Sequence, residues 1–120
     1  MKDNVLKDKS FKFAVRIVNL YKYLCDEKKE FVLSKQILRS GTSVGAIIRE
    51  AEHSESKMDF IHKLAIAQKE SNETVYWLEL LKETEYISIN EFESINPNAI
   101  EILKLITSII KTTKQNSINN

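Results

Sequence analysis

The chain has 120 residues, of which 42% are hydrophobic and 29% charged, and its formal net charge is +1. A chain of this length fits one domain and can bury a modest core without disulfides or metal. Its apolar and charged fractions are those of a globular protein rather than a disordered one. Two glycines and one proline leave little material for turns. A many-stranded fold is therefore disfavoured, and long helices joined by short loops are expected.

The sequence also bears on the location of the protein. The longest uncharged run, Ser40–Ile48, is far shorter than the ~20 residues that cross a bilayer. The chain begins with charged residues instead of an apolar signal core. Cys25 is the one cysteine and lies in an apolar stretch, so we expect a buried, inert thiol. The expected location is cytoplasmic, with no membrane partner.

Charge is unevenly distributed along the chain. Residues 1–49 carry 11 Lys/Arg and 5 Asp/Glu, whereas residues 50–120 carry 7 and 12. One interpretation is a solvated surface rich in lysine. The other is a molecule with a basic side and an acidic side, which would orient subunits against one another or present one face to a polyanion.

An apolar period of 3.6 residues predicts four helical segments. The first is expected over about residues 8–28, with an apolar stripe through Phe13, Ile17, Leu20 and Leu24. The second is expected over about residues 34–52 and has a face of small residues, Ser40, Gly41, Ser43 and Gly45. Each glycine in a helix costs about 1 kcal/mol relative to alanine. Close approach of a neighbouring helix would offset that cost.

The third segment is expected over about residues 57–85, and Ser56 with Asp59 resembles a capping box at its start. Near its end, Val75–Leu81 leaves almost no polar face. A helix that is apolar all round is covered on more than one side. We therefore predict a subunit interface formed by Tyr76, Trp77, Leu80 and Leu81.

The fourth segment is expected over about residues 90–115, capped either by Asn90 with Glu93 or by Ser88 with Glu91. Pro97 interrupts its early part, so a kink or a restart is expected there. The tail, residues 116–120, is expected to fray.

The connections between these segments are short, about four residues each, so successive helices become antiparallel neighbours. The predicted fold is all-α, a single domain over residues 1–120 that forms an antiparallel up-down-up-down four-helix bundle.

Folding the second segment onto the third places Arg39 opposite Glu70 and within a turn of Glu73. One interpretation is a recognition or catalytic pair. The other, which we favour, is an inter-helix ion pair that fixes register, because a buried charge needs such a partner. The predicted polar layer comprises Gln36, Arg39, Ser40, Ser43, Glu70 and Glu73.

Basic residues gather in or just before the first segment. Phe11 and Tyr23 lie among them and are suited to stacking on bases. One interpretation is a solvated helix face, and the other is a nucleic-acid-binding surface. The candidate binding residues are Lys7, Lys9, Lys12, Arg16 and Lys22.

Two pairs, Glu50 with His53 and Asp59 with His62, have the spacing found in carboxylate-bridged di-iron bundles. Such sites also need inward carboxylates from the other two helices. The end of the fourth segment offers Lys111, Lys114 and Gln115 instead. No nucleophile elbow or phosphate-binding glycine loop is present. We expect no metal, no cofactor, no small-molecule substrate and no enzymatic activity.

Two blocks of the sequence, Gln36–Ala46 and Lys57–Leu81, carry a resemblance to a known family. The chain resembles the bacterial four-helix bundle proteins first noticed in intervening sequences of 23S ribosomal RNA genes. Ile47 stands where this family usually has Asn, so a polar role does not carry over to that position. The matching positions are Gln36, Arg39, Ser40, Ser43, Glu50, Phe60, Leu64, Glu73 and Leu78.

The resemblance implies a left-handed antiparallel bundle that assembles as a ring, typically a pentamer. It also implies similarity to the accessory proteins of diversity-generating retroelements, which bind nucleic acid and a reverse transcriptase. No enzymatic activity, cofactor or metal is established for the family.

Three hypotheses follow. The leading one is a non-enzymatic homo-oligomer, pentamer preferred, that binds RNA or an RNA-associated partner. The alternative is a protein-interaction scaffold with no nucleic-acid role, and the third is an enzyme or metal-binding bundle. A basic patch on one face of the assembly would favour the first, whereas basic residues consumed in salt bridges would favour the second.

Overall fold

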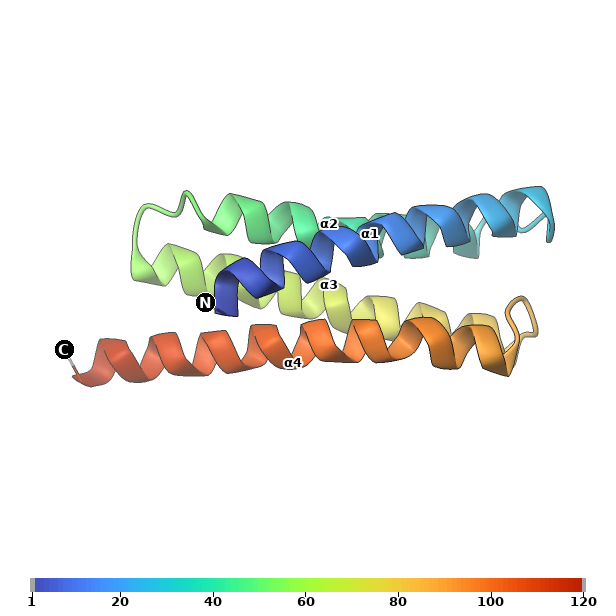
Figure 1. The fold of residues 1–120 in the computed structure, drawn as a ribbon. Helices are drawn as coiled ribbons and strands as arrows, with labels where there is room; N and C mark the ends of the chain where they lie inside the picture. Colours follow the sequence, from blue (N-terminus) through green and yellow to red (C-terminus); the bar gives the residue numbers. More distant parts are fainter. Residues whose placement is uncertain (1, 120) are drawn as a thin grey trace.

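The computed structural model describes residues 2–119, with side chains described for residues 5–116. It contains four helices: α1 (Lys2–Asp26), α2 (Leu33–Ala51), α3 (Lys57–Glu83) and α4 (Ile89–Asn119). They run along one long axis, and the molecule measures 53 × 22 × 20 Å (Figure 1). The predicted all-α, antiparallel four-helix bundle is confirmed.

The helices surround the core in chain order. Each of α1, α2 and α3 packs against the next helix, and α4 packs back against α1. Across the diagonals, α1 with α3 and α2 with α4, no two described residues have Cα atoms within 8 Å of each other. The two chain ends and the α2–α3 loop lie at one end of the bundle, and the other two loops lie at the opposite end (Figure 1). The outward faces of α1 and α3 therefore point in opposite directions.

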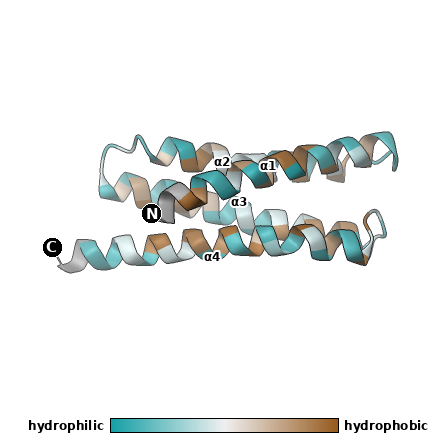
Figure 2. Ribbon diagram, in the orientation of Figure 1, coloured by the Kyte–Doolittle hydropathy of each residue, from teal (hydrophilic) through white to brown (hydrophobic). Residues whose placement is uncertain are grey.

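The core consists of the stripes that the 3.6-residue period predicts. Apolar and polar stretches alternate along every helix (Figure 2), so each helix turns one apolar face inward. Ile17, Leu24, Ile37, Leu78 and Ile106 have no exposed surface at all. Burial of such aliphatic side chains is the main favourable term in folding.

The structure extends α1 six residues beyond its predicted start, from Asp8 back to Lys2. Leu6 explains the difference, because it is only 1% exposed and continues the stripe of Phe13 toward the start of the helix. The charged residues that follow Leu6, Lys7, Asp8 and Lys9, are partly or fully exposed on the same helix, and they conceal this stripe in the sequence.

Close approach of α1 and α2 explains both glycines. A Cβ added at Gly41 would lie 2.8 Å from Cγ1 of Ile17, and one added at Gly45 would lie 3.3 Å from the backbone oxygen of Ser10. The small residues therefore let two helices of the same chain approach each other, which offsets the low helix propensity of glycine.

Caps define the helix starts. The Ser56 hydroxyl accepts a hydrogen bond from the Asp59 amide at 3.0 Å, while the Asp59 carboxylate accepts one from the Glu55 amide. Before α4, Ser88 and Glu91 form a full reciprocal capping box, so the Ser88 alternative is the one realised.

Glu30 caps α2, a role that the sequence did not suggest. Its carboxylate accepts hydrogen bonds from the amides of Val32, Leu33 and Ser34, the last at 2.7 Å. Burial raises the pKa of Glu30, but these amide hydrogen bonds outweigh burial and leave the pKa below its ordinary value.

The expected restart at Pro97 is wrong, since α4 continues through that residue as one helix. Proline removes one amide and leaves the carbonyl of Glu93 without its helical partner. Both residues are exposed, so water can bond that carbonyl. At its other end α4 is helical to Asn119, and Asn120, the last residue of the tail expected to fray, lies outside the described residues.

Candidate nucleic-acid and subunit interfaces

Three of the four α1 lysines proposed for nucleic acid, Lys7, Lys9 and Lys12, make ion pairs within the chain. Lys7 lies 3.2 Å from the Glu52 carboxylate at the end of α2. Lys9 lies 3.3 Å from Glu101 on α4, and Lys12 lies 3.1 Å from Asp8 one turn earlier. The acidic second half of the chain thus neutralises two of these three cations.

Arg16 and Lys22 differ from these lysines. The Arg16 guanidinium donates to the Ser94 carbonyl at 2.9 Å and to Oδ1 of Asn98 at 2.5 Å, so it joins α1 to α4 without a carboxylate. Lys22 is exposed and has no ion pair with any residue whose side chain the structure describes. Only Lys22 of the five candidates therefore presents an unengaged cation.

The two aromatic residues among these cations are also engaged. Phe11 is 52% exposed, and the Arg49 guanidinium lies 5.1 Å from its ring centre. The Lys28 ammonium lies 5.9 Å from the ring centre of Tyr23. Cation–π contacts of this kind contribute little at an exposed site, so a stacking base could displace either cation.

The predicted inter-helix ion pair on Arg39 is confirmed. Its guanidinium lies 3.3 Å from the Glu70 carboxylate and also contacts that of Glu73. The side chain of Arg39 is 53% exposed, however, and that of Glu73 is 37% exposed. The pair spans α2 and α3 on the outside of the bundle rather than in a buried layer.

The buried polar contact between α2 and α3 is made by Ser40 and Thr74, the residues that follow Arg39 and Glu73 in the sequence. The sequence analysis did not identify Thr74. Thr74 donates a hydrogen bond to Ser40 at 2.9 Å, and neither residue has any exposed surface. Ser43 instead donates to the carbonyl of Arg39 in its own helix. Gln36 is exposed, and no inter-helix bond is found for it among the described residues.

The predicted interface segment divides between core and surface. Leu81 has no exposed surface and packs in the core, so its assignment to a subunit interface is wrong. The neighbouring helices cover this part of α3 more completely than expected. Leu80 and Trp77 are half-buried, whereas Tyr76 is 57% exposed.

Trp77 and Tyr76 form one aromatic surface on α3. Their ring centres lie 5.0 Å apart with an interplanar angle of 70°, an edge-to-face geometry that adds to burial. The indole nitrogen of Trp77 is buried and has no hydrogen-bond acceptor. A buried N–H without a hydrogen-bond acceptor is destabilising, and such groups are rare in native proteins.

A second exposed apolar surface lies on α1, where Phe11 and Val15 are 52% and 47% exposed. Phe11 borders a groove between α1 and α2 that the small residues Ala14, Gly45 and Ala46 also line. This surface is separate from the aromatic surface on α3.

A row of unpaired lysines on α4 was missed by the sequence analysis. Lys104, Lys111 and Lys114 are exposed and have no ion pair with any side chain that the structure describes. No acidic residue follows Glu101 in the chain. The absence of acidic residues after Glu101 indicates that these lysines lack nearby carboxylates in the sequence. The net negative charge of residues 50–120 as a whole hides this feature.

The candidate metal pairs do not converge. Among the described residues, no group of three or more His, Cys, Asp or Glu could hold a metal ion. Glu50, His53 and His62 are exposed, and Asp59 is paired with Lys63 at 3.1 Å. No helix in the described part of the chain is both long and apolar enough to cross a membrane.

Comparison with known proteins places the chain in a family. A model of the 23S rRNA-intervening sequence proteins matches residues 2–108. The chain belongs to this family. A crystal structure from Bacteroides thetaiotaomicron, a protein of unknown function from the S23 ribosomal protein family, is 69% identical. It superposes with a TM-score of 0.91 over 92% of this chain and 99% of that one.

A search of curated proteins finds no match. Family membership thus agrees with the resemblance carried by Gln36–Ala46 and Lys57–Leu81, and with the bundle fold. Lys111 and Lys114 lie beyond the residues that the family model matches.

Proposed function

We propose that this protein is a homo-oligomeric helical bundle, pentamer preferred, that acts by binding RNA or an RNA-associated partner rather than by catalysis. The observation that carries the assembly is the presence of two separate exposed apolar surfaces on one protomer. A cyclic ring other than a dimer needs two different, complementary patches on each subunit. Tyr76 with Trp77 supplies one, and Phe11 with Val15 supplies the other.

Assembly of this kind would cover Tyr76 and Phe11, which are 57% and 52% exposed in the protomer. A neighbouring subunit would pack against the exposed ring of Tyr76, whereas the indole N–H of Trp77 is already buried within the protomer. The small residues in the floor of the Phe11 groove leave room for an inserted aromatic side chain. Aromatic anchors that fill pockets dominate the energy of most interfaces.

The test of assembly is sedimentation velocity at tens of micromolar protein. We expect a species of several subunits for the wild type and monomer for both Tyr76→Glu and Phe11→Glu, because either charge disrupts one of the two patches. Asn90→Glu, at an exposed position in the first turn of α4 and outside both patches, is the control and should leave assembly unchanged. A wild type that sediments only as monomer would overturn the proposal.

The lysine row on α4 supports RNA as the ligand. An ammonium without a carboxylate partner can neutralise a phosphate without first breaking an ion pair, and each contact releases counterions. A ring repeats Lys104, Lys111 and Lys114 in every subunit, so contacts that are weak singly become strong together. Binding should be weakly sequence-specific and steeply salt-dependent.

Two triple variants with equal charge change distinguish the surfaces. Replacing Lys104, Lys111 and Lys114 by Gln should weaken RNA binding and flatten its salt slope by about 0.7 for each phosphate that is no longer neutralised. Replacing Lys7, Lys9 and Lys12 by Gln should change the slope less, because these lysines are already paired. Fluorescence anisotropy with a labelled structured RNA across a salt series measures both.

The scaffold hypothesis is favoured by one specific observation, namely the ion pairs of Lys7, Lys9 and Lys12. These pairs offset the charge of three of the six basic residues of α1. No RNA binding at low salt, with the oligomer intact, would establish the scaffold as the better account.

A further inference from the structure

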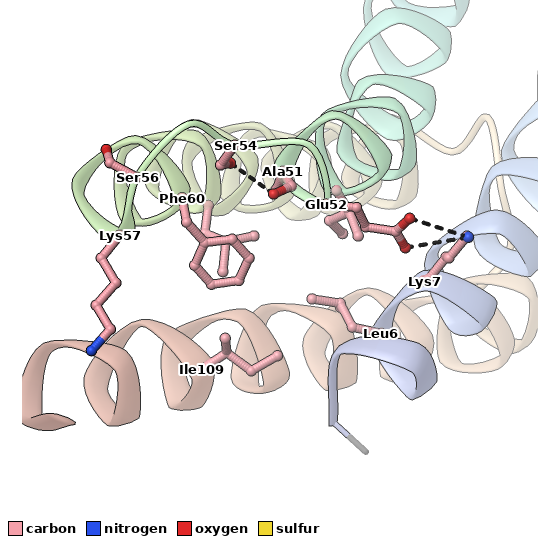
Figure 3. A pocket seen from close by; sticks show the side chains of 11 residues that line it. Leu6, Lys7, Ala51, Glu52, Ser54, Ser56, Lys57, Phe60 and Ile109 are labelled. Carbon is pink, nitrogen blue, oxygen red and sulfur yellow. Dashed lines mark hydrogen bonds and ion pairs between the residues drawn. The ribbon is translucent and has the colours of Figure 1, made fainter. Parts of the chain in front are cut away.

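A cavity of about 480 Å³ opens at the end of the bundle that holds the α2–α3 loop. Figure 3 shows it between the first turns of α1, the loop and the last third of α4. Its volume lies in the range of small-molecule sites, about 300–1,000 Å³. Its apolar walls are Leu6, Ile48, Ala51, Phe60, Leu64 and Ile109.

The cavity exists because the core narrows at this end. Ala51 is the last residue of α2 and fills little space. Beyond it the chain leaves the bundle in the loop of residues 52–56, so no longer side chain closes the gap between Leu6 and Phe60. Phe60 is only half-buried. Binding of an apolar group in the cavity would bury apolar protein surface that is otherwise exposed to water, which is favourable.

The polar groups at the mouth differ in how fully they are engaged. Ser54 donates to the Ala51 carbonyl at 2.7 Å, and Ser56 accepts from the Asp59 amide. Lys7 is held by Glu52. Lys57 is exposed and has no ion pair with any side chain in the described part of the chain. In Figure 3 its ammonium lies across the mouth from Lys7, above the end of α4.

The unbalanced charge at the mouth is therefore positive, while the interior is aliphatic and aromatic. We propose that this cavity binds an amphiphilic monoanion, an aliphatic carboxylate whose tail occupies the apolar cavity and whose head group pairs with Lys57. A carboxylate at the rim remains partly hydrated, so its charge is not buried at high cost. This ligand site is separate from the apolar surfaces and the lysine row of the proposed function.

The test uses decanoate as the probe, with decanol as its uncharged counterpart and acetate as the head group alone. Methyl-labelled protein is titrated in an NMR experiment. We expect decanoate to shift the methyl signals of Leu6, Leu64 and Ile109 and to leave those of Ile87 and Ile95, at the opposite end, unchanged. Acetate should shift none of them, because it has no tail.

Variants then separate charge from volume. Lys57→Gln should weaken decanoate binding about tenfold, the reduction expected for one charge-assisted contact, and leave decanol binding unchanged. Lys69→Gln, at another exposed lysine of α3, should leave both unchanged. Ala51→Leu should weaken both ligands by filling the cavity, with circular dichroism confirming that the bundle remains folded.

Three results would overturn the proposal. They are no methyl shift up to the solubility limit of decanoate, shifts located away from the cavity, or equal decanoate affinity in wild type and Lys57→Gln. The last would mean that the cavity selects an apolar ligand without regard to charge. Because Lys57→Gln alters none of the residues assigned to assembly or RNA binding, the outcome is independent of the proposed function.

Discussion

The two sides of α2 meet their neighbouring helices by different means. Toward α1, Gly41 presents bare backbone to Ile17, and a Cβ would lie 2.8 and 2.9 Å from two atoms of that side chain. Toward α3, Ser40 bonds Thr74 inside the bundle and Arg39 pairs with Glu70 at its surface. The α1–α2 contact depends on close steric packing. The α2–α3 contact depends on polar pairs, some of whose hydrogen bonds water can replace.

The difference predicts how each side tolerates change. A packed interface has no room for extra atoms, and overpacking is destabilising even where the added group is apolar. An exposed ion pair contributes little, because water solvates either partner once the other is removed. The α1 side should therefore dominate stability, while the α3 side should mainly fix which residues lie opposite one another.

The largest expected effect follows from filling the space at Gly41. Gly41→Val should lower the free energy of unfolding by about 3 kcal/mol, since Ile17 is β-branched, fully buried and unable to move aside. Urea denaturation followed by circular dichroism measures the decrease. Ala65→Val, at an exposed position on α3, is the control and should change stability by less than about 1 kcal/mol.

A double-mutant cycle sharpens this result. Removing side-chain volume at Ile17 by substitution with alanine should be far less harmful in the Gly41→Val background than in the wild type, because the valine occupies part of the space. If the two changes were additive, the destabilisation by Gly41→Val would not arise from a clash with Ile17.

The loops that flank α2 show the same contrast. The α1–α2 loop is held by Glu30, only 8% exposed, whereas the α2–α3 loop is held by Ser56 and Asp59 in contact with water. Glu30→Gln should cost about 2 kcal/mol at neutral pH, because three amides lose a charged acceptor. Asp59→Asn is the control and should have the smaller effect.

The effect of Glu30 depends on pH. Its pKa in the folded state lies below the ordinary value of 4.5, so the folded protein favours the ionised form. The contribution is complete above the unfolded pKa and disappears as pH falls through the folded pKa. Denaturation midpoints of wild type and Glu30→Gln should converge on acidification from neutral pH to below about pH 4. A constant difference across that range would contradict the cap.

The sequence predicts the fold well because the 3.6-residue period is set by local geometry. It also predicts the pairing of Arg39 with Glu70, since a short loop fixes the register of adjacent antiparallel helices. It does not predict the ion pair of Lys9 with Glu101, which depends on how α1 and α4 rotate about their own axes when the bundle closes. For that reason the sequence alone overstates the unpaired positive charge on α1.

Helix ends and the divided aromatic segment were harder to predict. Leu6 was concealed by flanking charges, and Glu30 caps a helix from a position that lies in a charged run of the sequence. Leu81 and Tyr76 are close in sequence yet lie on opposite sides of α3, one in the core and one exposed. Only packing against α2 and α4 determines where that division falls.

The smallest expected effect tests the α3 side of α2 directly. Arg39→Met should lower stability by no more than about 1 kcal/mol, because more than half of the arginine side chain is exposed and Glu73 is accessible to water. The wild-type advantage should shrink further in high salt, which screens exposed pairs. Thermal melts at low and high ionic strength measure both effects. A decrease of several kcal/mol that persists in high salt would mean that the pair acts as a buried one, and the distinction between the two sides of α2 would then fail.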